Sequence, residues 1–137
     1  MKKLFLLALC FVILITGCSS PSNITREVTS EEVVAAFKAT GLEVENTRPM
    51  TRDDYVTAPY VCKGTRFFIP SLGEGRGGRI YICDNTKDRN LLAEYYKGMG
   101  KINDIFFSWV FAKGSVLVQI NGDLEESIAR MYKAAIP

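Results

Sequence analysis

The sequence predicts an α+β fold: a mainly antiparallel sheet of about five strands, built from two hairpins, with about three helices packed on one face. Two pairs of β-rich runs are joined by short or glycine-rich segments, which is typical of hairpins. Three apolar stretches at helical spacing each follow residues that cap helices. Most consecutive strands are joined by turns too short for the crossover that a parallel sheet needs.

The chain begins with the layout of a cleaved secretion signal. Two lysines precede an apolar run over residues 4–15, which is shorter than the roughly 20 residues of a membrane-spanning helix. The run leads into the letters ITGC at residues 15–18 and a polar stretch. This pattern resembles the lipobox of bacterial lipoproteins, which implies cleavage after residue 17 and lipid on Cys18. A plain signal peptide with an incidental cysteine is the alternative.

Cleavage at that point changes the charge balance. The 137 residues contain 17 Lys and Arg against 15 Asp and Glu, a formal net charge of +2. Residues 1–17 include two of the lysines and no acid, so the mature chain has 15 charges of each sign. A neutral chain lacks the positive charge that attracts nucleic acid or an anionic membrane face. We therefore expect no nucleic-acid partner, and attachment to the membrane only through lipid on Cys18.

The mature chain divides into a tether and one domain. Residues 18–28 are polar and show no period, so we expect a lipid-anchored tether whose reach is about 35 Å when extended. Residues 29–137 have the length of a single α+β domain with one core. The expected location is the extracytoplasmic face of the cell membrane.

The domain opens on a helix. Thr29 as N-cap and Glu32 three residues later form a capping box, and Gly41 supplies the left-handed residue that ends many helices. Residues 42–45 alternate and predict a first strand, and residues 46–59 lack a period and predict a long loop.

A hairpin follows, with strands at residues 66–69 and 79–82. If residue 66 lies opposite residue 79, the numbers of every two paired residues add up to 145. The numbers of Cys62 and Cys83 also add up to 145, so this register places the two cysteines opposite each other. Antiparallel neighbours approach within the Cα separation that a disulfide requires, so we predict a disulfide between these cysteines. Two separate buried thiols are the alternative. Both first residues are arginine, and like charges placed opposite each other are mildly unfavourable.

Two more helices are expected. Asn85 or Thr86 caps the second helix, and the Gly-Met-Gly sequence at residues 98–100 ends it. Asp123 and Glu126 repeat the capping pattern before the last helix. The inner side of that last helix is expected to consist of Ile128, Met131, Tyr132 and Ala135.

The second hairpin is predicted between these two helices. Residues 105–112 and 115–121 form its strands, with Lys113 and Gly114 as a two-residue turn. This turn would pair Phe111 with Val116, Trp109 with Val118, and Phe107 with Ile120.

The sequence is poor in catalytic residues. It contains no histidine, which removes the usual general base and the histidine-containing zinc sites. Of the four cysteines, Cys10 leaves with the signal and Cys18 carries lipid, which leaves one pair for the disulfide. We therefore expect no catalytic residue, no metal and no cofactor. A pair of loop carboxylates acting on a glycoside is a weaker alternative, with candidates Asp53, Asp54, Glu74 and Asp84.

Residues 84–90 place oxygen ligands at alternate positions, as a calcium loop does. The sixth position is Arg89 where glycine is needed, and the twelfth is Tyr95 where a bidentate glutamate is needed. We interpret the segment as a corner between a strand and a helix.

The candidate binding loop consists of Gly75, Arg76, Gly77, Gly78 and Arg79. Glycines free backbone N–H groups to form an anion-binding nest, and arginines bind phosphoryl groups. The alternative is a hairpin tip that needs glycine only for its conformation. A second possible contact surface is an exposed aromatic patch of Tyr55, Tyr60, Phe106 and Trp109, although Trp109 is expected in the core.

Beyond the lipobox, the domain is similar to small uncharacterised lipoproteins of Gram-positive bacteria, through residues 66–83 and 106–124. The resemblance implies no activity. We expect a membrane-anchored, non-catalytic binding module whose partner is an envelope protein or another envelope component. The alternative is a small envelope enzyme or ligand-binding component that uses the Gly/Arg-rich loop. A deep polar cleft gathering Arg76, Arg79, Tyr81 and Asp84 would favour that alternative.

Overall fold

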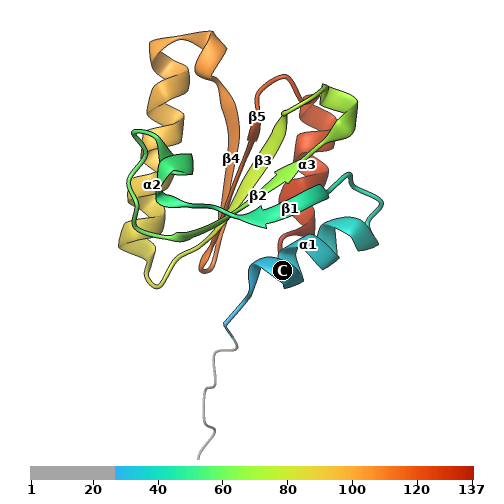
Figure 1. Cartoon of the computed structure of the whole chain (residues 1–137), viewed down its shortest axis with the longest axis horizontal. Helices are drawn as coiled ribbons and strands as arrows, with labels where there is room; N and C mark the ends of the chain where they lie inside the picture. The colour runs from blue at the N-terminus through green and yellow to red at the C-terminus, as the bar shows by residue number, and fades with distance from the viewer. Residues whose placement is uncertain (1–26) are drawn as a thin grey trace, which may run out of the picture.

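The structure is a computed structural model that describes residues 27–137 (Figure 1). The expected signal peptide, the Cys18 lipid site and most of the 18–28 tether lie outside the described residues.

The described chain has the predicted α+β class, with three α-helices and a five-stranded antiparallel sheet. The helices are α1 (Ser30–Ala39), α2 (Thr86–Ile102) and α3 (Glu126–Ala135). The strands are β1 (Glu45–Pro49), β2 (Lys63–Phe68), β3 (Gly77–Ile82), β4 (Ser108–Lys113) and β5 (Val116–Asn121). Short 3₁₀ helices are η1 (Arg52–Tyr55), η2 (Pro70–Leu72) and η3 (Asp104–Phe106).

The sheet has the strand order β1-β2-β3-β5-β4, and every neighbouring pair is antiparallel. The hairpin of β2 and β3 therefore pairs with the hairpin of β4 and β5, and the strands that meet are β3 and β5. The strand β5 lies inside the sheet and is buried along most of its length.

The helices cover both faces of the sheet, so the prediction of three helices on one face is wrong. Helices α1 and α3 share a core with Ile80 and Val118, whereas α2 packs over Tyr81 and Leu117. Successive residues of a strand point to opposite faces, so the buried pair Ile80 and Tyr81 requires cover on both sides. Figure 1 shows α2 on one side of the sheet and α1 with α3 on the other.

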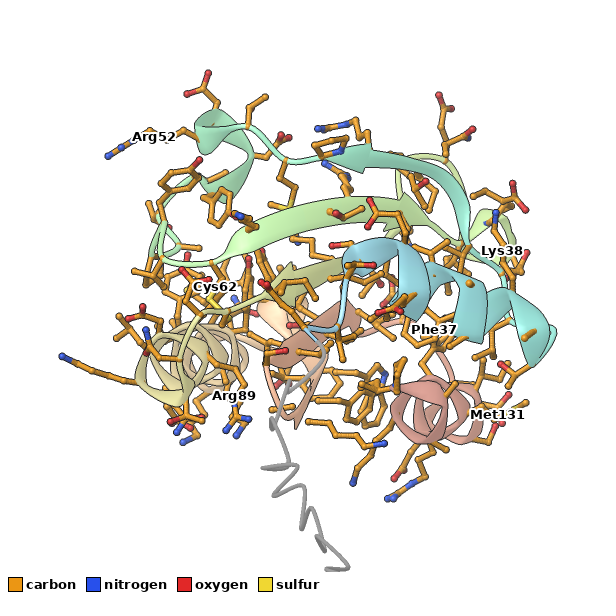
Figure 2. All side chains as sticks on the ribbon, turned by 90° about the horizontal axis from the view of Figure 1, so that it is seen from below. Phe37, Lys38, Arg52, Cys62, Arg89 and Met131 are labelled. Carbon is orange, nitrogen blue, oxygen red and sulfur yellow. A yellow bond between two sulfur atoms is a disulfide. The ribbon has the colours of Figure 1, made fainter. Side chains whose placement is uncertain are left out.

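The first core is built around aromatic residues. The ring of Phe37 on α1 meets that of Tyr132 on α3 edge to face, with centroids 5.0 Å apart. Figure 2 shows Phe37 between these helices and Met131 on the outer side of α3. Met131 is 50% exposed and Ile128 38% exposed, so both were wrongly expected on the inner side of this helix. Ala129 and Tyr132 are its buried residues.

The capping box of α1 is confirmed. The Glu32 N–H donates to Thr29 Oγ1 at 3.3 Å, and the Thr29 N–H donates to Glu32 Oε2 at 3.1 Å. Gly41 follows the helix with a φ of 77°, in the left-handed region. Asn85 caps α2 by accepting from the Asp88 N–H. The last helix differs from its prediction, because Glu125 is its N-cap and provides no side-chain cap.

Several predicted boundaries shift. Leu42 and Val44 are buried but precede β1, which begins at Glu45 and occupies part of the expected loop. Helix α2 continues through Gly98 and Gly100 to Ile102. At Gly100 an added Cβ would lie 3.2 Å from the Cα of Phe107, so a glycine there lets the residue that follows η3 pack closely against the helix.

The register of the first hairpin is confirmed. Arg66 pairs with Arg79, and the disulfide between Cys62 and Cys83 forms with its Cα atoms 4.6 Å apart. The second hairpin is shifted by two residues from its prediction: Phe111 pairs with Val118 and Trp109 with Ile120.

The turn of the second hairpin explains this shift. Its two turn residues follow Lys113, which pairs with Val116 and belongs to the strand. The first turn residue, Gly114, has a φ of 56°, and the two-residue turn with glycine at its first position suits a hairpin.

Candidate functional site

The Gly/Arg-rich segment does not form one loop. Gly75 lies in the turn with a φ of 72°, but Gly77, Gly78 and Arg79 belong to β3. A Cβ added at Gly77 would lie 2.1 Å from the Phe67 carbonyl oxygen. One added at Gly78 would lie 2.6 Å from the Gln119 carbonyl oxygen. These two glycines therefore allow close contact within the sheet.

The two arginines of this segment diverge. Arg76 lies at the exposed tip, where Nη1 forms a salt bridge with Asp123 at 2.5 Å. Arg79 lies within the sheet, opposite Arg66 on β2, which is itself opposite Arg48 on β1. Residues directly opposite each other in a sheet share a face. Three guanidinium-bearing residues thus form a row across three strands, here called the arginine row (Arg48, Arg66 and Arg79).

A β-bulge completes the arginine row. The pairing of β1 with β2 shifts between Glu45 and Arg48, and Asn46 within the bulge has a positive φ of 48°. A shift of one residue moves a side chain to the other face of the sheet. The bulge therefore places Arg48 on the same face as Arg66, which is also the face of Tyr81 and α2.

Arg48 has an acidic partner. Its guanidinium donates to both carboxylate oxygens of Asp54 in η1, at 2.8 and 2.7 Å. These bonds, with a bond from the Thr51 N–H, hold the pKa of Asp54 well below its ordinary value. The bond with Asp54 likewise raises the pKa of Arg48.

Arg66 and Arg79 have no such partner, since neither forms a salt bridge within residues 27–137. Arg66 Nη2 donates to the Gly75 carbonyl oxygen at 3.0 Å, and its guanidinium lies 5.1 Å from the centre of the Phe68 ring. Partial burial is the largest cause of a lowered pKa at Arg66, and the charges of Arg79 and Arg48 lower it further.

Arg79 is held by one side-chain hydrogen bond. Its Nη1 donates to Gln119 Oε1 at 2.9 Å, and Gln119 is only 7% exposed. The Arg79 Nε–H is buried and has no acceptor among the described residues. Five N–H groups can donate from a guanidinium, so the described chain leaves most of this capacity unused.

Two tyrosines lie beside this region. The hydroxyls of Tyr81 on β3 and Tyr96 on α2 are hydrogen-bonded to each other at 2.5 Å. Burial raises the pKa of both, and the positive charge of Arg79 acts against that rise. Both hydroxyls therefore stay protonated at neutral pH, and because one donates to the other, the pair has one hydroxyl proton left to donate elsewhere.

Two hollows are lined by residues that contact the arginine row, although no arginine of the row lines either of them. One of about 510 Å³ is lined by Phe68 and Gly75, the two residues that Arg66 contacts, together with Asn46, Pro70, Gly73 and the acidic Glu74. Another of about 210 Å³ is lined by Gln119, Tyr96 and residues of η3.

A second surface feature lies at the end of α2. Four large apolar side chains within six residues are exposed: Ile102 by 77%, Ile105 by 82%, Phe106 by 50% and Phe107 by 44%. We call these residues the end cluster. Asn103 fixes the turn between them by accepting from the Ile105 N–H at 2.9 Å. The sequence predicts a strand from residue 105, but in the structure the strand begins only at Ser108.

The predicted aromatic patch is divided. Tyr55 is buried beneath Tyr60, with ring centroids 4.7 Å apart, whereas Phe106 belongs to η3. Trp109 is partly buried against the first core, and its indole N–H donates to the Leu124 carbonyl oxygen at 2.9 Å.

The candidate carboxylates are also separated. Asp54 is paired with Arg48, whereas Glu74 precedes β3 and Asp84 follows it, so these two lie beyond opposite ends of one strand. Arg76, Arg79, Tyr81 and Asp84 consequently do not gather in one polar cleft. Within residues 27–137, no group of three or more His, Cys, Asp and Glu side chains is placed to hold a metal ion.

None of the helices described in residues 27–137 has both the length and the apolar character needed to cross a membrane. Comparison with protein families, curated proteins and solved structures finds no match to this chain.

Proposed function

We propose that this chain is a membrane-anchored, extracytoplasmic lipoprotein that acts as a non-catalytic binding module at the cell envelope. The observation that carries the proposal is the end cluster, where Ile102 and Ile105 are the most exposed of four neighbouring apolar side chains. Contiguous exposed apolar groups mark protein contact surfaces, and aromatic residues such as Phe106 contribute strongly to binding.

The position of the end cluster supports this role. In Figure 1 the described chain starts at the bottom of the molecule, and the segment from α2 to β4 is at the top. An anchor that precedes Glu27 is therefore attached at the end opposite the end cluster, which leaves that surface open to an envelope protein. A tether raises the effective concentration of the two partners, so a modest apolar contact suffices.

A second candidate function is ligand binding on the α2 face of the sheet. The arginine row favours it, because two of its guanidiniums have no acidic partner in the described chain.

The anchor is tested by replacing Cys18 with Ser. We expect the wild-type chain in the membrane fraction, labelled by a fatty-acid probe, and the Cys18→Ser chain without label. Equal labelling of both chains would contradict lipid attachment at Cys18.

The contact surface is tested by placing a photo-crosslinking amino acid at Ile105 in cells. Met131 is the matched control, because it is an exposed apolar residue on a different helix. We expect one reproducible envelope-protein adduct from position 105 and none from position 131, and we expect Phe106→Asp to abolish it. Identical adducts from both positions would refute the end cluster as the binding surface.

A further inference from the structure

The arginine row departs from ordinary sheet design. Like charges directly opposite each other destabilise a sheet, yet Arg66 stands opposite both Arg48 and Arg79. Asp54 forms its salt bridge with Arg48, so Arg66 and Arg79 are the two guanidiniums of the row that have no salt-bridge partner among residues 27–137. Burial adds to the cost of the Arg66 charge, since burial and its two arginine neighbours all lower its pKa.

The geometry points to a phosphoryl-group site between Arg66 and Arg79, on the α2 face of the sheet. A dianionic phosphate matches the two uncompensated charges. Its tetrahedral oxygens accept bonds from two guanidiniums at once, whereas one guanidinium already satisfies both oxygens of a carboxylate. This site is distinct from the end cluster and goes beyond the proposed protein contact.

Existing contacts hold both side chains ready. Arg66 is fixed by the Gly75 carbonyl oxygen and the Phe68 ring, and Arg79 by Gln119. The remaining N–H groups of each guanidinium have no protein acceptor among residues 27–137. The hollow of about 510 Å³ is lined by Phe68 and Gly75, which contact Arg66, and by the acidic Glu74, so it suits an uncharged or cationic part of the ligand rather than the phosphate itself.

The test measures thermal unfolding of the purified full-length chain in micelles of a neutral detergent, followed by the fluorescence of Trp109. Inorganic phosphate is compared with chloride at equal ionic strength. We expect phosphate at 100 times its Kd to raise the unfolding midpoint by about 10 °C relative to chloride.

Three variants locate the site. Arg66→Gln and Arg79→Gln should each abolish the phosphate shift, while their midpoints in chloride stay equal to or above that of the wild type because charge repulsion is relieved. Arg76→Gln is the control, since its salt bridge with Asp123 lies at the turn. Loss of the shift in Arg76→Gln but not in Arg79→Gln would overturn the proposal. Broadening of the ³¹P resonance of phosphate by the wild-type chain provides a second readout that is independent of unfolding.

A further arm distinguishes a soluble phosphate from a lipid headgroup. Micelles are doped with phosphatidic acid or, as the control, with phosphatidylcholine. A shift with inorganic phosphate supports a soluble ligand, and a shift only with phosphatidic acid supports a lipid headgroup. No shift in either arm would overturn the site. The assay contains no partner protein, so its failure is separate from failure of the crosslinking test.

Discussion

Gly64, on β2, has no side chain and therefore leaves room for the side chains of three neighbouring residues. An added Cβ would lie 2.7 Å from the Met50 sulfur, 2.9 Å from the Tyr55 hydroxyl and 3.1 Å from the Tyr81 ring. These residues belong to the core on the α2 face of the sheet, and the Tyr55 hydroxyl also donates to the Cys62 carbonyl oxygen. A small residue at this position therefore fixes how η1 packs on the sheet.

We predict that Gly64→Ala lowers the free energy of unfolding by about 1–3 kcal/mol, because overpacking displaces these side chains. The matched control is Gly98→Ala in α2, where no atom lies within 4 Å of an added Cβ. That change should raise the free energy of unfolding by about 0.5–1 kcal/mol, because alanine favours a helix. Urea titration followed by Trp109 fluorescence measures both, and equal effects would contradict the packing argument.

Asp54 links the arginine row to acid stability. Its pKa is lowered in the folded chain, so its contribution to stability is complete above the ordinary aspartate pKa of about 4 and is lost as the pH falls further. We predict that Asp54→Asn is less stable than the wild type at pH 7 and that the difference shrinks towards pH 2. Denaturant titrations across this range measure it, with Asp53→Asn as the control. A difference that does not depend on pH would show that charge is not the cause.

Among the elements of residues 27–137, the first hairpin carries a disulfide at its base. The disulfide joins residues 21 apart, and closing such a loop restricts the unfolded chain. We predict that the Cys62→Ser, Cys83→Ser double variant loses about 3 kcal/mol of stability. The wild type measured in reducing agent should match it. A double variant as stable as the oxidised wild type would contradict this role.

The accuracy of the sequence predictions differs between elements for physical reasons. The first hairpin was predictable because two cysteines and two β-rich runs share one register. The strand β1 was placed too early because its five residues are all exposed and give no apolar alternation. The turn at Gly114 was misplaced by one residue, since only the φ of this glycine in the structure shows which turn position it occupies.

At the scale of the whole molecule, the sequence could not reveal how the sheet is covered. The buried run from Ile80 to Ile82 does not alternate with polar residues, so it is compatible with one or two covered faces. The opposition of Arg66 and Arg79 followed from the hairpin, but the addition of Arg48 depends on the bulge in β1. The end cluster was missed because its apolar residues are equally typical of a buried strand.

The position of β5 has a consequence for the newly synthesised chain. This strand joins β3 to β4 in the finished sheet, but the ribosome makes it after both of them. A chain that has emerged only as far as residue 115 holds a three-stranded piece and a separate fourth strand, each with unpaired backbone groups at its edge. Sheet assembly is therefore a late event in synthesis, and a chain that stops before Val116 keeps two sets of strands that β5 cannot join, which favours aggregation over folding.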